Sequence, residues 1–149
     1  MLLLISACGF SPLYNSNNSA KMAEKISIQE PNTQNDFVFY VQLTNRFTEG
    51  SSKYILNYAI TTSKKDRGLN FDGTAHRVEI SGSVSFNLID AESGVKLLSD
   101  KEEMSLSYSN FGSTAAVLNA ERITNKQLVV VLADKVADRI SLAIVEKGS

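Results

Sequence analysis

The sequence predicts a single α+β domain, in which a mixed four-stranded sheet carries two helices packed on one face. Two patterns in the chain of 149 residues lead to this prediction. Residues 78–88 alternate apolar and polar side chains, which is typical of a strand with one face in water. Residues 113–145 instead repeat apolar side chains at the spacing of a helix. The expected order of elements is β-α-β-β-β-α.

The first part of the domain is expected to contain a short strand and a helix. Residues 25–30 alternate apolar and polar side chains, and Pro31 ends this strand. Asn35 and Asp36 are expected to cap a helix that stops at Gly50. The expected apolar face of this helix consists of Phe37, Val38, Tyr40, Val41, Thr44 and Phe47.

Three strands are expected to follow. Residues 54–62 are rich in aromatic and β-branched side chains, which favours a strand, and the polar residues 63–73 are expected to form the turn after it. The alternating strand then leads into a hairpin loop at residues 90–94, where Gly94 is placed to adopt a positive φ. Residues 95–108 return as the partner strand, and their charged middle suits an exposed bend or edge.

The last helix is expected to pack on the same face of the sheet as the first. Its length would approach about 50 Å, and a break near Asn119 is an alternative to one continuous helix. The first two strands should pair in parallel, and the later strands should form a meander. The expected apolar stripe of the last helix consists of Thr124, Leu128, Val131, Leu132, Val136, Ile140 and Ile144.

The start of the chain carries a lipidation pattern. An apolar run and two small residues precede Cys8, as a lipoprotein signal peptidase requires, and Cys8 is the only cysteine. Residues 1–7 are therefore expected to be a truncated lipoprotein signal peptide, residues 8–23 a lipid-anchored tether, and residues 24–149 the α+β domain. The alternatives are that these residues form a buried N-terminal strand, or that Met1 is an internal methionine of a longer chain.

Composition argues against several classes of function. A net charge of -1 and a pI of about 5.8 give no basic field, so nucleic acid is not an expected partner. No stretch approaches the roughly 20 apolar residues of a membrane span. One cysteine and one histidine, His76, do not suffice for a disulfide scaffold or a zinc site. No nucleophile–base pair or phosphate loop is present, so we expect neither an enzyme nor a cofactor.

Two segments are candidates for function. Lys64, Lys65, Arg67 and Arg77 gather around the expected turn and could meet phosphate groups through charge-assisted hydrogen bonds. The alternative for these side chains is an ordinary solvated loop. Residues 10–14 are more apolar than a linker usually is, so we expect them to lie against lipid or a partner, or else to pack under the domain.

Three parts of the chain together resemble a known family. Residues 8–14 have the sequence Cys-Gly-Phe-Ser-Pro-Leu-Tyr, and residues 68–77 contain two glycines and an aspartate before the alternating strand. Residues 116–122 and 132–140 belong to the expected last helix. In these parts the sequence is similar to the lipopolysaccharide-assembly lipoproteins LptE, also called RlpB, of the alphaproteobacterial type. The similarity covers nearly the whole chain after Cys8.

This resemblance implies a function. Members of the family are outer-membrane lipoproteins that sit as a plug inside the β-barrel LptD, help it to assemble and take part in lipopolysaccharide delivery to the cell surface. The resemblance also implies a lipid anchor on Cys8, a position on the periplasmic side of the outer membrane, and two helices against a four-stranded sheet. The alternative is a lipid-anchored binding lipoprotein of another envelope transport complex.

The resemblance also indicates where lipopolysaccharide would bind. In gammaproteobacterial members, basic residues near the strand turn and at the start of the last helix are linked to lipopolysaccharide contact. The matching positions in this sequence are Asp72 and Asn119. The residues expected to contact lipopolysaccharide phosphates are the basic ones nearby, namely Arg67, Arg77, Arg122, Lys64 and Lys65.

Overall fold

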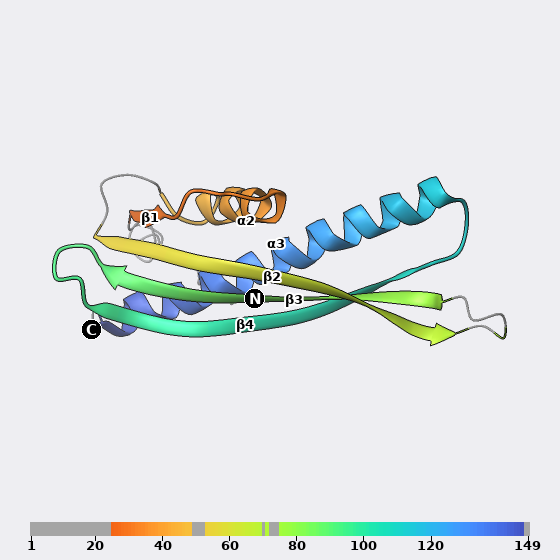
Figure 1. Cartoon of the computed structure of the whole chain (residues 1–149). Helices are drawn as coiled ribbons and strands as arrows, with labels where there is room; N and C mark the ends of the chain where they lie inside the picture. Colours follow the sequence, from red (N-terminus) through yellow and green to blue (C-terminus); the bar gives the residue numbers. More distant parts are fainter. Residues whose placement is uncertain (1–24, 49–52, 70, 72–74, 148–149) are drawn as a thin grey trace, which may run out of the picture.

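The computed structural model describes residues 25–48, 53–69, 71 and 75–147 and confirms the expected fold (Figure 1). The elements in chain order are β1 (Ile26–Ile28), α2 (Gln34–Thr44), β2 (Tyr54–Leu69), β3 (Ala75–Asp90), β4 (Lys96–Ser109) and α3 (Thr114–Lys147). The strands form one sheet in the order β1-β2-β3-β4. β1 runs parallel to β2, whereas β2, β3 and β4 form an antiparallel meander.

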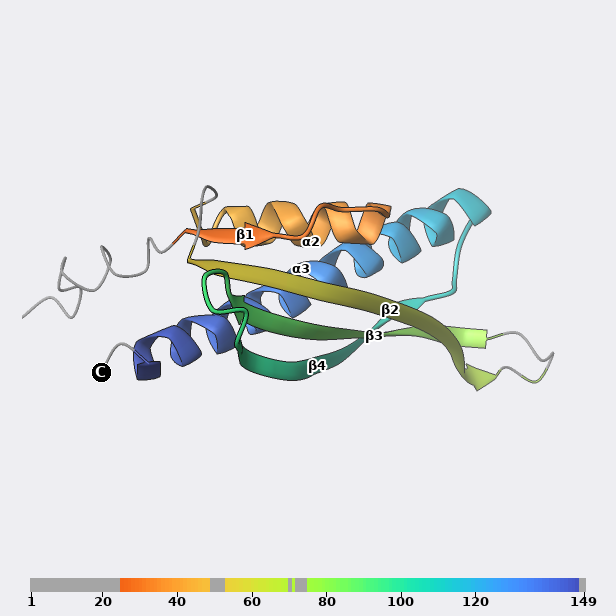
Figure 2. The same ribbon diagram turned by 60° about the vertical axis from the view of Figure 1, so that its left-hand side comes forward.

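Both helices cover the same face of this sheet, and the opposite face carries no helix among the described residues (Figures 1 and 2). Along β3 the buried residues Val84, Phe86 and Leu88 alternate with the more exposed Ser83, Ser85 and Asn87, as the sequence predicts. The registers place the buried positions of neighbouring strands side by side, for example Leu56 beside Leu88. The core therefore lies between one sheet face and the two helices.

The helix α2 begins two residues earlier than expected. Its N-cap is Thr33, whose hydroxyl accepts a hydrogen bond from the Asp36 backbone N–H at 3.1 Å. Asp36 accepts one in return from the Thr33 N–H at 2.9 Å. This reciprocal capping box satisfies two backbone donors, so the prediction of a cap at Asn35 was wrong, although Asp36 does supply the acidic first turn. The helix ends at Thr44, and Gly50 lies outside the described residues.

The buried face of α2 also differs from the expected one. Phe39 and Leu43 are fully buried, whereas Phe37 is 58% exposed. Phe39 packs against Tyr58 of β2, with the ring centroids 4.7 Å apart. The adjoining side of the helix meets α3 through polar contacts, such as Gln42 Nε2 donating to Asp134 Oδ1 at 2.9 Å. The expected face is therefore met in part: Phe47 is buried, and Val38 and Tyr40 are partly buried against the core. Phe39 and Leu43 were missed, because part of the inward surface of the helix is polar and apolar periodicity alone does not locate it.

The polar stretch after residue 62 is a strand rather than a turn. β2 continues to Leu69, and its register with β3 runs from Tyr54 opposite Asp90 to Leu69 opposite Ala75. Antiparallel pairing supplies backbone hydrogen bonds whatever the side chains are, so the partner strand overrides the polar sequence. The result is a long β2–β3 hairpin that ends at the far end of the molecule from Lys25 and Lys147 (Figures 1 and 2).

Two other expectations are met in the second half of the fold. The hairpin loop after β3 has Gly94 at a φ of 69°, and the Gly94 N–H donates to the Asp90 carbonyl oxygen at 2.9 Å. The helix α3 is continuous from Thr114 to Lys147, so the alternative of a break near Asn119 was wrong. β4 is an edge strand of the sheet, which agrees with its charged middle.

The long helix α3 packs on β3 at a glycine. A Cβ atom at Gly82 would lie 2.9 Å from Leu128 Cδ2 and 3.0 Å from Leu132 Cδ1, so the bare glycine lets the helix approach the strand closely. The expected stripe of α3 is confirmed in large part, but Val131 and Ile144 are only half-buried. The buried residues of α3 are Thr124, Leu128, Val129, Leu132, Ala133, Val136, Ala137 and Ile140.

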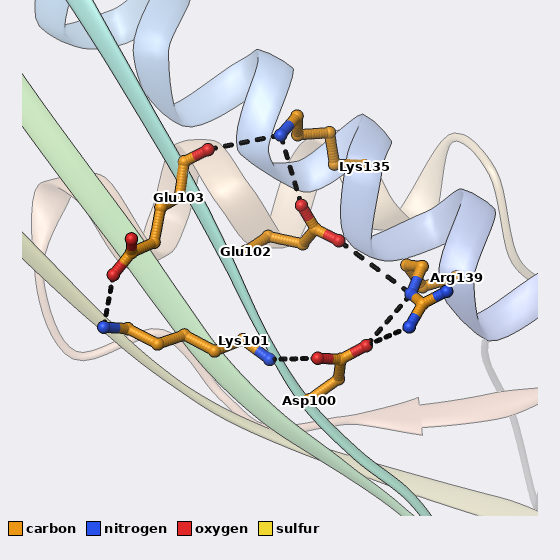
Figure 3. A network of polar contacts seen from close by, with 6 residues as sticks. All are labelled: Asp100, Lys101, Glu102, Glu103, Lys135 and Arg139. Carbon is orange, nitrogen blue, oxygen red and sulfur yellow. Dashed lines mark hydrogen bonds and ion pairs between the residues drawn. The ribbon is translucent and has the colours of Figure 1, made fainter.

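Charged side chains fix α3 against the edge strand β4 (Figure 3). Lys135 Nζ donates to Glu102 Oε2 at 3.2 Å, and the Arg139 guanidinium forms an ion pair with Asp100. On the opposite side of the sheet, Lys101 forms an ion pair with Glu103. Consecutive strand residues point to opposite faces, so the adjacent Glu102 and Glu103 serve different neighbours, as their position on a strand predicts.

Acid is expected to weaken this contact between α3 and β4. The Arg139 guanidinium donates to Asp100 and lowers the pKa of that carboxyl. Because the folded pKa is the lower one, the stabilisation is fully present above the usual pKa of about 4 and is lost as the pH falls through the folded value. The variant Asp100→Asn should therefore lose less stability than the wild type between about pH 7 and about pH 3. Urea midpoints measure this loss, and equal losses in both proteins would contradict the prediction.

Candidate functional site

The middle of the open face of the sheet is lined mainly by hydroxyl groups. The residues on this face lie side by side in rows that cross β2, β3 and β4. One such row consists of Ser63, Ser81 and Ser105. Ser81 Oγ lies 2.8 Å from Ser105 Oγ in this row. The short side chains leave a shallow hollow of about 430 Å³. Its lining consists of Thr61, Ser63, Ser81, Gly82, Ser83, Glu103, Met104 and Ser105.

Three of the predicted basic residues gather beyond this hollow, at the end of the β2–β3 hairpin. Lys65 and Arg67 of β2 lie on the open face, and Arg77 lies directly opposite Arg67 on β3. Glu79 is the register partner of Lys65 and accepts a hydrogen bond from Arg67 Nη2 at 2.7 Å. We call Lys65, Arg67, Arg77 and Glu79 the basic hairpin end. The sequence placed these cations around a turn, whereas the structure places them on paired strands.

The charges of the basic hairpin end are only partly compensated. The Arg67 guanidinium donates to Glu79 and lowers the pKa of its carboxyl, so Glu79 is ionised at neutral pH. Within the described part of the chain, Arg77 makes no ion pair. Like charges directly opposite each other across two strands are unfavourable. An anion bound beside Arg67 and Arg77 would relieve this repulsion, which suits the pair to phosphate binding.

Lys64 does not belong to this group, because it lies on the helix-covered side. Its Nζ donates to Glu121 Oε1 of α3 at 2.7 Å, and the Tyr108 hydroxyl donates to Glu121 Oε2 at 3.0 Å. The Lys64 hydrogen bond lowers the pKa of Glu121, and burial raises the pKa of Tyr108 to about 12. Lys64 therefore ties the hairpin to α3 and is not placed to join a ligand on the open face.

The other predicted site residues lie elsewhere. Arg122 is exposed on α3, on the helix side of the sheet, and its Nη2 donates to Asn119 Oδ1 at 3.1 Å. Cys8 and Asp72 lie outside the described residues, as does the predicted segment 10–14. The structure thus brings together Lys65, Arg67 and Arg77 and separates them from Lys64 and Arg122 by the thickness of the sheet.

Sequence reasoning missed two features of this end of the molecule. Glu79 alternates regularly with apolar residues, and only the register reveals that it partners the basic side chains. Phe71 lies between β2 and β3 and is fully exposed, as a relative accessibility of 115% indicates. The only signal for Phe71 in the sequence was its position as an apolar residue within a polar stretch.

Two further observations concern other kinds of site. In the described ranges, no group of three or more histidine, cysteine, aspartate and glutamate side chains is arranged to hold a metal ion. The described helices also include none that is both long and apolar enough to cross a membrane.

Comparisons with known proteins find the same fold in several solved structures. No family model matches the sequence, and no curated protein matches it. Solved structures do match: an α+β domain of two helices on a four-stranded sheet is the fold of several bacterial lipoproteins. The first is rare lipoprotein B from Shewanella oneidensis, at a TM-score of 0.66 and 14% identity over 84% of this chain and 98% of that one.

Two other solved structures give the same result. A candidate lipoprotein from Caulobacter crescentus has a TM-score of 0.65 and 18% identity over 82% of this chain and 91% of that one. An uncharacterised lipoprotein B from Nitrosomonas europaea has a TM-score of 0.64 and 15% identity over 79% and 82%, respectively. The expected resemblance to the RlpB lipoproteins is therefore confirmed for the fold.

Proposed function

We propose that this protein is an outer-membrane lipoprotein that plugs the LptD β-barrel, assists its assembly and takes part in lipopolysaccharide delivery to the cell surface. The observation that carries the proposal is the combination, in one chain, of the lipidation motif around Cys8 with the fold of rare lipoprotein B. The lipid anchor would hold the protein on the periplasmic side of the outer membrane. A noncatalytic role is consistent with the absence of a nucleophile–base pair from the sequence.

The arrangement of the elements supports this proposal. The described chain begins at Lys25, at the end of the molecule opposite the basic hairpin end (Figures 1 and 2). A β2 strand of 16 residues spans about 50 Å at 3.3 Å per residue, so the start of the described chain and the cationic residues are well separated. In the proposed complex, one end would be tethered to the membrane while the other reaches into the barrel and meets lipopolysaccharide phosphates.

Reversing two charges of the basic hairpin end should weaken lipopolysaccharide binding. In Arg67→Glu/Arg77→Glu, two donors to phosphate become repelling carboxylates, and we expect a loss of at least about tenfold in affinity at low salt. The matched control is Lys96→Glu/Lys147→Glu, which changes the net charge equally at the other end of the molecule. Unchanged binding in the hairpin variant would remove this site from the proposal and leave the role in barrel assembly.

Depletion of the protein tests that role in assembly. We expect the fully assembled form of LptD to disappear from outer membranes as the lipoprotein is depleted, and an unrelated β-barrel in the same membranes to persist. The folded barrel can be distinguished from the unfolded one by its mobility in unheated gels. Normal levels of folded LptD after complete depletion would contradict the proposed role.

A further inference from the structure

One side of β2 has no partner strand along most of its length. β1 pairs with β2 only from Tyr54 to Leu56, and no other described strand pairs with that side of β2 (Figures 1 and 2). The next backbone donor on this side, the Tyr58 N–H, bonds to the side-chain oxygen of Gln29 at 3.3 Å. The strand continues beyond this contact, and residues 61–66 are exposed. We call residues 60–66 the β2 edge.

The backbone of the β2 edge is arranged to pair with a further strand. The Gln29 N–H donates to the Leu56 carbonyl oxygen at 2.9 Å, so the backbone groups of the even-numbered residues of β2 point away from β3. The β2 edge contains no proline, and its register with β3 runs without a shift. It spans about 23 Å at 3.3 Å per residue, which is enough for a strand of ordinary length. Its outward-pointing residues are Ile60, Thr62, Lys64 and Asp66.

The other edge of the sheet is protected against such pairing. In β4 the Lys101 N–H donates to the Asp100 carboxylate at 2.8 Å, and Lys135 of α3 donates to the Glu103 carbonyl oxygen at 3.2 Å. Lysine side chains often protect an edge strand, but the Lys64 ammonium is held by α3 beneath the sheet. No described residue makes a comparable hydrogen bond to the backbone of the β2 edge. The two edges therefore differ in their capacity to accept a strand.

The charge beside the β2 edge limits what can pair with it. The register partner of Lys65 is Glu79, whose carboxylate is bonded to Arg67, and Lys65 makes no ion pair within the described part of the chain. A strand added beside β2 would place a side chain next to Lys65, and opposite charges on neighbouring strands are favourable. A second copy of β2 would instead add cations to the same stretch. The charge thus favours an extended acidic segment of another protein.

We propose that the β2 edge binds an extended segment of the barrel protein by strand addition, with an acidic side chain of that segment beside Lys65. This inference rests on the proposed function, which supplies the barrel as the partner, and it adds the part of the lipoprotein that holds the barrel. In strand addition the main-chain hydrogen bonds provide affinity and the side chains provide specificity.

The test removes one backbone donor from the β2 edge. In Thr62→Pro the N–H that points away from β3 is lost, whereas the hydrogen bonds to β3 remain. Thr62→Ala is the matched control, because it removes the side chain and keeps the donor. Ser107→Pro makes the same backbone change on β4, where the N–H also points away from β3. Each lipidated variant is captured through a C-terminal tag from detergent-solubilised whole cells, and the recovered LptD is quantified by mass spectrometry.

We expect Thr62→Pro to lower the recovery of LptD at least about tenfold, because the lost donor also leaves a carbonyl group of the partner unpaired. Both controls should recover as much LptD as the parent. Equal recovery by Thr62→Pro and the parent would overturn this inference and leave the proposed function standing. A parent protein that recovers no LptD would contradict both.

Amide hydrogen exchange in the parent protein tests the same contact without a substitution that could disturb folding. In the free protein the N–H groups of Thr62 and Lys64 should exchange fast, and those of Thr61 and Ser63, which point toward β3, should exchange slowly. In the complex with LptD, the N–H groups of Thr62 and Lys64 should become protected. Unchanged exchange at these two positions would overturn the inference. Protection that grows with the concentration of the isolated lipoprotein would also overturn it, because the occupant would then be a second copy.

Discussion

Replacing Leu132 by alanine is expected to lower the free energy of unfolding by about 2–5 kcal/mol, because a large truncation in a packed core leaves a cavity. Leu132 is fully buried on α3, and its Cδ1 lies 3.0 Å from the position that a Cβ atom would take on Gly82 of β3. A loss of this size is a large part of the stability of an ordinary domain. Denaturant unfolding of the wild type and the variant measures the difference.

A second leucine on the same helix provides the control for this variant. Leu142 is 58% exposed, so Leu142→Ala removes the same atoms without opening a core cavity. We expect it to change the free energy of unfolding by less than about 0.5 kcal/mol. Similar effects of the two substitutions would show that the closeness of α3 to β3 at Gly82 does not determine the stability of the fold.

Replacing Cys8 by serine is expected to abolish stable membrane attachment. The thiol is the proposed site of acylation, and a serine hydroxyl does not replace it in diacylglyceryl transfer. Because membrane attachment needs more than one acyl chain, complete loss of the anchor should release the protein from washed membranes. Immunoblots of membrane and soluble fractions measure the distribution, with Ser11→Ala as a control close to the same site. Retention of Cys8→Ser in washed membranes would show that a different contact anchors the protein.

The periodic segments of the sequence predicted their elements well. In β3 the alternation from Val78 to Leu88 identified both the strand and its buried face, because one face meets the helices and the other meets water. The long apolar stripe of α3 did the same for the last helix. These features depend on local pattern alone, and the sequence carries that pattern directly.

The elements that sequence reasoning missed depend on contacts between distant segments. The strand character of residues 63–69 comes from pairing with β3, and the buried face of α2 comes from sharing its inward surface between Tyr58 and the polar side of α3. The local propensity of these residues carries no information about either of these contacts. For the same reason the sequence did not reveal that Gly82 lies under α3, although it is the one interruption in the apolar pattern of its strand.

The candidate site was predicted in composition but not in arrangement. The sequence identified five basic residues, and the strand register sorts them: Lys65, Arg67 and Arg77 share the open face, whereas Lys64 points toward α3. This separation follows from the alternation of side chains along a strand, which could not be applied while residues 63–73 were assigned to a turn. The missed strand thus also explains why the sequence did not separate Lys64 from Lys65, Arg67 and Arg77.

The identity of the partner tests the proposed function most directly. The lipidated protein, carrying an affinity tag at its C-terminus, is captured from detergent-solubilised whole cells, and the co-purifying proteins are identified by mass spectrometry. A matched capture of Cys8→Ser controls for contacts made after solubilisation. The proposal predicts that LptD is the main partner, in a ratio near one to one. Capture of an inner-membrane transport complex without LptD would contradict it and would favour an auxiliary lipoprotein of another envelope transport system.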